Sequence, residues 1–97
     1  LRTMFGDMME KLQQMQQQVG ESKARLSTIT VEGKADGITI VVDGNRKVKD
    51  VRIEQHLLED VEDLQDLLIT AMNRAIEAAD KANEAEMAAQ ARSLLGR

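Results

Sequence analysis

The chain has 97 residues, a formal net charge of −4, 42% hydrophobic residues and 31% charged residues. This balance is typical of a folded domain with a large solvated surface, and it excludes a wholly disordered chain. Cysteine is absent, which excludes disulfide frameworks and thiolate metal sites. The longest apolar runs are only a few residues long and no signal peptide is evident, so we expect a cytoplasmic protein without a membrane span.

The first segment predicts a helix over residues 4–27, because its apolar positions recur at alternating spacings of three and four. Gln, Glu and Lys fill most positions between them. The seam formed by this repeat consists of Phe5, Met8, Leu12, Met15, Val19, Ser22 and Leu26. A narrow apolar stripe in a chain too short for a large core must be buried against a partner. We therefore expect a homodimer.

The middle segment, residues 28–54, changes to the pattern of β-strands. Two β-branched runs, 28–32 and 38–42, flank the turn sequence Ala-Asp-Gly and predict an antiparallel hairpin. Asp43-Gly44-Asn45 predicts a second tight turn, followed by a third strand in which Val51 and Ile53 alternate with charged residues. Val48 has the wrong parity for that face, which indicates either a bulge or a solvent-exposed strand start.

The last segment predicts a long helix over residues 60–92. Asp60 is a good N-cap, and acidic residues in the first turns suit the helix dipole. No proline interrupts the Ala-rich remainder, so about 30 residues give a helix of about 45 Å. Strands of five to seven residues cover only about 20 Å. The predicted fold is therefore α+β: one domain, 1–97, with an α-β-β-β-α order, in which a three-stranded antiparallel meander lies between two long helices whose distal halves project or pack on another chain.

No enzyme is expected from the inventory of reactive side chains. The one histidine, His56, lies in a link beside two leucines and lacks a catalytic partner. Nucleotide-binding and zinc-protease motifs are absent. The acidic residues from 59 to 66 lack the DxDxDG pattern of a calcium loop and are interpreted as a dipole-matched helix start. We expect no metal, cofactor or small-molecule substrate.

Charge is distributed unevenly along the chain. Residues 59–97 carry nine acidic and four basic groups, whereas the four basic residues Arg46, Lys47, Lys49 and Arg52 fall within seven positions. Two interpretations of this positive edge remain open. Basic residues on an edge strand deter aggregation, and they also bind phosphates.

The chain resembles the YbaB/EbfC family of bacterial nucleoid-associated proteins over nearly its whole length. The resemblance rests on the order and spacing of several short elements: Met4-Phe5-Gly6, Met15-Gln16-Gln17-Gln18, Ile29-Thr30-Val31-Glu32, residues 40–45, Val51-Arg52-Ile53, Leu57-Leu58-Glu59-Asp60, and Asp66-Leu67-Leu68 with residues 71–75. It implies a tight, intertwined, tweezers-like homodimer that binds double-stranded DNA at the nucleoid and helps to organise it or to modulate gene expression. Two departures are Gln55-His56, where many relatives have a Pro-Ser-like pair, and the Gly- and Met-rich tails of many relatives, which are not visible in this sequence.

The resemblance implies that the helical arms contact DNA, which points to Lys11, Lys23, Arg25, Arg74 and Lys81. The positive edge adds Arg46, Lys47 and Lys49, and the choice between the two sets stays open at this point. Trp and Tyr are absent and Phe5 belongs to the seam, so the chain lacks a stacking platform for unpaired bases. We therefore expect phosphate contact with a duplex, on a positive face separate from the acidic face of the last helix.

An alternative function of a different class is a prefoldin-like or chaperone-like module that grips unfolded protein between paired helical arms. Its adaptable surface would consist of Met8, Met9, Met15, Met72 and Met87. The competing interpretation of Met8 and Met15 is the dimer seam, since both lie in line with Leu12 and Val19. Suppression of a client protein's aggregation would distinguish the two functions.

Overall fold

The computed structural model describes residues 2–96, with side chains from Met4 onward. The elements follow the predicted α-β-β-β-α order, and a short 3-10 helix occupies the link before the last helix. Their bounds are α1 Arg2–Thr28, β1 Thr30–Ala35, β2 Ile38–Asp43, β3 Val48–Ile53, η1 Gln55–Glu59 and α2 Val61–Leu95. Both helices are thus slightly longer than predicted. Asp60 caps α2 as expected, because its side chain accepts a hydrogen bond from Asp63 N at 3.1 Å.

The three strands form an antiparallel meander in the order β1-β2-β3. The register pairs Val42 with Val48 and Val41 with Asp50, so Lys49 is an extra residue in β3. In a regular strand Val48 and Val51 would point to opposite faces of the sheet. The bulge places the Val48 side chain on the face that carries Val51 and Ile53. Val48 is also 46% exposed, so both features raised by the sequence are present.

The core lies between α2 and the first two strands. Ile38, Ile40 and Val42 of β2 are at most 1% exposed and pack against an alanine face of α2. That face consists of Ala71, Ala75 and Ala79, each fully buried. Small side chains allow the helix to lie close to the sheet, and Gly33 of β1 contributes to this close approach.

α2 covers β1 and β2 but leaves the same face of β3 open. Val48, Val51 and Ile53 are 46%, 44% and 39% exposed, although each is paired with a buried residue of β2. The open strip of sheet is bordered by the flank of α2 that carries Ile69 and Ile76, which are 61% and 39% exposed. The chain therefore presents an unfilled apolar corner between α2 and β3.

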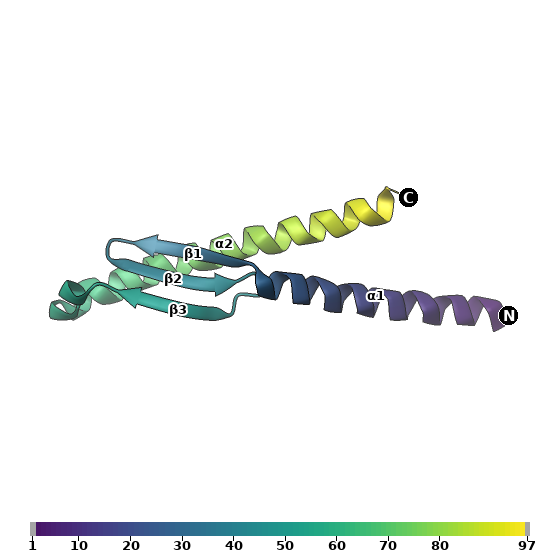
Figure 1. The fold of residues 1–97 in the computed structure, drawn as a ribbon, viewed down its shortest axis with the longest axis horizontal. Coiled ribbons are helices and arrows are strands. Elements are labelled where there is room, and N and C mark those ends of the chain that lie inside the picture. Colours follow the sequence, from purple (N-terminus) through teal and green to yellow (C-terminus); the bar gives the residue numbers. More distant parts are fainter. Residues whose placement is uncertain (1, 97) are drawn as a thin grey trace.

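Both helices extend beyond the sheet as two arms whose free ends lie at the same end of the molecule (Figure 1). The molecule measures 70 × 22 × 18 Å, as predicted from helices that are longer than the strands. The arms meet at the β2–β3 turn. Gly44 N donates to Leu26 O at 2.9 Å, and Asn83 Nδ2 donates to Gly44 O at 3.3 Å.

Of the predicted seam, Leu26 differs from the other apolar members because it is buried within its own chain. It is 4% exposed, and a Cβ added to Gly44 would lie 2.7 Å from Leu26 Cδ2. Leu26 therefore belongs to the joint at the base of the arms. The remaining apolar members, Phe5, Met8, Leu12, Met15 and Val19, are 52–69% exposed.

Candidate nucleic-acid interface

Three of the eight basic residues predicted for DNA contact form ion pairs with carboxylates of the same chain. Arg25 Nη2 lies 2.6 Å from Glu86 Oε1, Arg46 Nη2 lies 2.5 Å from Asp80 Oδ1, and Lys49 Nζ lies 3.9 Å from Asp43 Oδ2. The ion pair with Glu86 raises the pKa of the Arg25 guanidinium, chiefly through the side-chain hydrogen bond. Their charges are thus largely compensated within the protein.

Arg74 serves as a tie between α2 and β1. Its Nη1 donates a hydrogen bond to Lys34 O at 2.6 Å, which fixes the flank of α2 that faces β1. Among the side chains of residues 4–96, Arg74 has no carboxylate partner within ion-pair distance, and the same holds for Lys11, Lys23, Lys47 and Lys81.

The contact of Arg74 locates a basic row along α2. Lys81 follows Arg74 by seven residues and Arg92 follows Lys81 by eleven. Both spacings are close to whole numbers of helical turns, so the three side chains share one flank. The small residues Thr70, Ala78, Ala85 and Ala88 occupy the other positions on this flank. The basic row, defined as Arg74, Lys81 and Arg92, extends over about 27 Å at 1.5 Å per residue.

Three exposed acidic residues of α2 occupy a neighbouring face. Asp66, Glu77 and Glu84 follow one another at spacings of eleven and seven, and all are exposed. This face points away from the sheet, opposite the buried alanines. Glu77 and Glu84 lie beside the basic row, at spacings of three and four residues from Arg74 and Lys81, but among the described side chains neither forms an ion pair with it.

The remaining basic residues lie at two other places. Lys11 precedes Gln18 and Ser22 by seven and eleven residues, and both of these residues contact α2, so Lys11 lies on the flank of α1 that faces the other arm. Lys23 lines a hollow of about 380 Å³ at the base of the arms. Lys47 belongs to the nearby β2–β3 turn.

Sequence reasoning missed Arg92 and Lys34. Arg92 could have been found by placing the last helix on a wheel with Arg74 and Lys81. Lys34 could not, because only the fold brings β1 beside this flank of α2. Lys34 is also partly compensated, with Nζ 3.4 Å from Glu32 Oε2.

The one histidine of the chain pairs with a neighbouring carboxylate at the surface. His56 Nε2 lies 2.7 Å from Glu54 Oε2, and both side chains are about two-thirds exposed. Within residues 2–96 no three His, Asp or Glu side chains converge as metal ligands do. In the same range, neither helix contains a stretch long and apolar enough to cross a membrane.

The fold and its charge pattern define a class of protein with two projecting helical arms on a three-stranded sheet. Residues 2–94 match the model of the YbaB/EbfC DNA-binding family. A nucleoid-associated protein of Flavobacterium johnsoniae is 46% identical over 87 residues, covering 88% of this chain and 82% of the relative. One of Chlorobium phaeobacteroides is 39% identical over 95 residues, covering 95% and 85%.

A solved structure has the same fold. An uncharacterised protein of Helicobacter pylori superposes with a TM-score of 0.68 at 23% identity, covering 79% of this chain and 93% of that one. The sequence matches settle the family: this chain belongs to the YbaB/EbfC DNA-binding family.

Proposed function

We propose that this protein is a homodimeric, non-enzymatic nucleoid-associated protein that binds double-stranded DNA through phosphate contacts, and so takes part in nucleoid organisation and gene regulation. The observation that carries this proposal is the basic row on α2. A net-acidic protein is a poor ligand for DNA unless its positive groups share a surface of their own. The basic row provides such a surface, because among the described side chains its cations form no ion pair with a carboxylate.

The geometry of the basic row suits a duplex. Its three cations are spaced about 10 Å and 16 Å apart along the helix axis, on the scale of the major groove, which is about 12 Å wide. Ala78, Ala85 and Ala88 between them let the sugar-phosphate backbone approach closely. Such contacts position a protein on DNA but carry little sequence information.

Between the two sets of basic residues left open by the sequence, the structure favours the arms. Arg46 and Lys49 of the positive edge are engaged with Asp80 and Asp43, whereas Lys11 and Lys81 of the arms are not paired among the described side chains. We therefore assign the main duplex contact to the basic row, with Lys11 contributing from α1.

The homodimer is supported by the amount of apolar surface that one chain leaves open. The exposed side chains form three neighbouring groups: Phe5, Met8, Leu12, Met15 and Val19 on α1, Val48, Val51 and Ile53 on β3, and Ile69, Ile76 and Met87 on α2. Soluble monomers rarely expose a contiguous patch of this kind. A second copy is the proposed occupant because the coiled-coil seam of α1 fits an identical helix.

The test is binding to a labelled random-sequence duplex over a range of salt concentrations. The variant Arg74→Gln/Lys81→Gln/Arg92→Gln should weaken binding and reduce the salt slope by about 0.9 per lost phosphate contact. The matched control Lys47→Gln/Lys49→Gln/Arg52→Gln removes the same charge from the positive edge and should have a smaller effect. Salt-independent binding, or a control that loses as much affinity as the basic-row variant, would contradict the proposed mode.

A chaperone-like module remains the second candidate, because four of the five methionines named for its client-binding surface are exposed. Met8, Met9, Met15 and Met87 are 47–64% exposed, as an adaptable client-binding surface requires. Prevention of aggregation of a heat-denatured client, without affinity for the duplex at low salt, would favour this function over DNA binding.

A further inference from the structure

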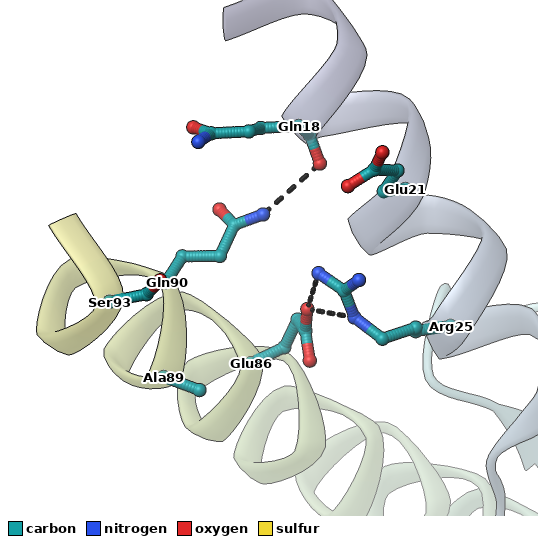
Figure 2. A pocket seen from close by; sticks show the side chains of 7 residues that line it. All are labelled: Gln18, Glu21, Arg25, Glu86, Ala89, Gln90 and Ser93. Atoms are coloured by element: carbon teal, nitrogen blue, oxygen red, sulfur yellow. Dashed lines mark hydrogen bonds and ion pairs between the residues drawn. The ribbon is translucent and has the colours of Figure 1, made fainter. Parts of the chain in front are cut away.

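The two arms are joined a second time beyond their base at the β2–β3 turn. Figure 2 shows Arg25 of α1 pointing at Glu86 of α2, and Gln90 of α2 reaching back to the backbone of Gln18 on α1. Arg25 Nε and Nη2 lie 2.7 Å and 2.6 Å from the same oxygen, Glu86 Oε1. Gln90 Nε2 donates to Gln18 O at 3.1 Å.

Ser22 connects the Arg25–Glu86 ion pair to the side-chain amide of Gln90. Its hydroxyl donates to Glu86 Oε1 at 3.1 Å and accepts a hydrogen bond from Gln90 Nε2. Glu86 Oε1 thus accepts from two side chains of α1, and the Glu86 side chain is only 13% exposed. The hydrogen bond from Arg25 lowers the pKa of the Glu86 carboxyl, so the carboxylate form that holds the contact is favoured.

The position of this hydrogen-bond network means that a small change in its geometry moves the ends of the arms by several ångströms. Among the described residues, hydrogen bonds and ion pairs between α1 and α2 end at Gln18 and Gln90. About 16 residues of α1 extend beyond that point, or about 24 Å. A rotation of about 10° at the joint would therefore move the tip of α1 by roughly 4 Å.

We infer that Ser22, Arg25, Glu86 and Gln90 form a latch that sets the separation of the two arms. Arg25 is then a positioning residue, and its charge serves Glu86 rather than a DNA phosphate. Where the proposed function holds, on which this consequence rests, the latch also sets the distance between Lys11 on α1 and the basic row on α2. Simultaneous contact by both arms requires that distance to match the duplex.

The first experiment measures the separation of the arms without DNA. The chain has no cysteine, so a thiol-specific spin label attaches only where a cysteine is introduced. We place one at Gln14→Cys and one at Ala91→Cys, which are exposed positions outside the latch. Labelled protein is mixed with an excess of unlabelled protein so that pulsed electron paramagnetic resonance reports distances within one chain. Glu86→Ala and Arg25→Gln should each broaden or shift the distance distribution, and Arg25→Glu/Glu86→Arg should restore it.

The matched control for Glu86→Ala is Glu84→Ala, which removes the same charge from the same helix at an exposed position. Circular dichroism establishes that each variant keeps its helical content. If Glu86→Ala does not fold, the distance distribution of Arg25→Gln decides the test. Distributions for the foldable latch variants that match the parent would overturn the inference, as would an equal change in Glu84→Ala.

A second experiment tests whether the latch affects DNA binding, by asking whether removal of an acidic residue strengthens or weakens the affinity for a duplex. Loss of an acidic residue strengthens duplex binding if only overall charge matters. We expect Glu84→Ala to bind a labelled duplex more tightly and Glu86→Ala to bind it more weakly. Tighter binding by both variants would overturn the role of the latch in DNA contact. A parent protein that fails to bind at any salt concentration would instead refute the proposed function, while the distance measurement would still decide on the latch.

Discussion

Ile40 and Val51 are direct partners on neighbouring antiparallel strands, yet Ile40 is fully buried and Val51 is 44% exposed. Partners of this kind point to the same face of a sheet. The difference therefore arises because α2 covers β2 and stops short of β3. One chain leaves part of its own sheet face unfilled, which supports the proposed homodimer.

Replacing Val51 by a charged residue tests this interpretation. Val51→Lys should lower the mass measured by light scattering toward that of one chain, because burying an unpaired ammonium in a dimer interface is costly. The protomer should keep its fold, since Val51 lies outside the buried core. Val41→Lys is the matched control on the opposite face, where Glu32 and Asp50 are the cross-strand partners. An unchanged mass for Val51→Lys would mean that this face is not the interface.

The α1 seam provides a separate test of the dimer. Leu12 is 52% exposed in the single chain, so Leu12→Asp removes little from the protomer and should act mainly on association or on the folding that depends on it. The measurement is again mass in solution, with helical content from circular dichroism. Gln14→Asp, at an exposed position off the seam, should leave the mass unchanged. A dimer that survives Leu12→Asp would exclude the seam from the interface.

The order of elements could be predicted from the sequence because local patterns define them. The seam of α1 and the β-branched runs of the strands indicate their own secondary structure. The parity of Val48 indicated either a bulge or an exposed strand start, and only the register places the bulge at Lys49. The fate of Leu26 could not be predicted, because its position in the heptad matches that of Leu12, and only the contact with Gly44 places it inside the chain.

The candidate site was predicted less completely, because several of its ion pairs join residues that are far apart in the sequence. Arg46 and Asp80 are 34 residues apart in the sequence, and their ion pair depends on the fold bringing the β2–β3 turn beside α2. The same is true of Arg25 and Glu86. By contrast, the spacing of Arg74, Lys81 and Arg92 is contained within one helix and was available from periodicity alone.

Gly33 offers a stability test of the contact between sheet and helix. A Cβ at this position would overlap Ala71 O and Ala75 N and would lie 2.7 Å from Ala75 Cα. Gly33→Ala should therefore destabilise the fold by about 1–3 kcal/mol or more, equivalent to a fall in melting temperature of roughly 4–8 °C per kcal/mol. Gly20→Ala is the control of opposite sign, because nothing lies within 4 Å of its Cβ position and alanine favours the helix by about 0.5–1 kcal/mol. Equal melting temperatures for the parent and Gly33→Ala would contradict the close approach of α2.

The latch should open in acid. The pKa of Glu86 is lowered from its ordinary 4.5, first by the hydrogen bond from Arg25 and opposed by partial desolvation, while Ser22 contributes a further hydrogen bond. Because the folded-state pKa is the lower one, the stabilising contribution is complete above pH 4.5 and is lost as the pH falls through the lowered value. Arg25, whose pKa is raised by Glu86 and to a smaller degree by Glu21, stays charged throughout. The distance between labelled arms should broaden in this acidic range before helical content falls. Glu86→Ala should show the broad distribution already at neutral pH and no further change on acidification, and a parent distribution that stays narrow until the helices melt would contradict the role of the carboxylate.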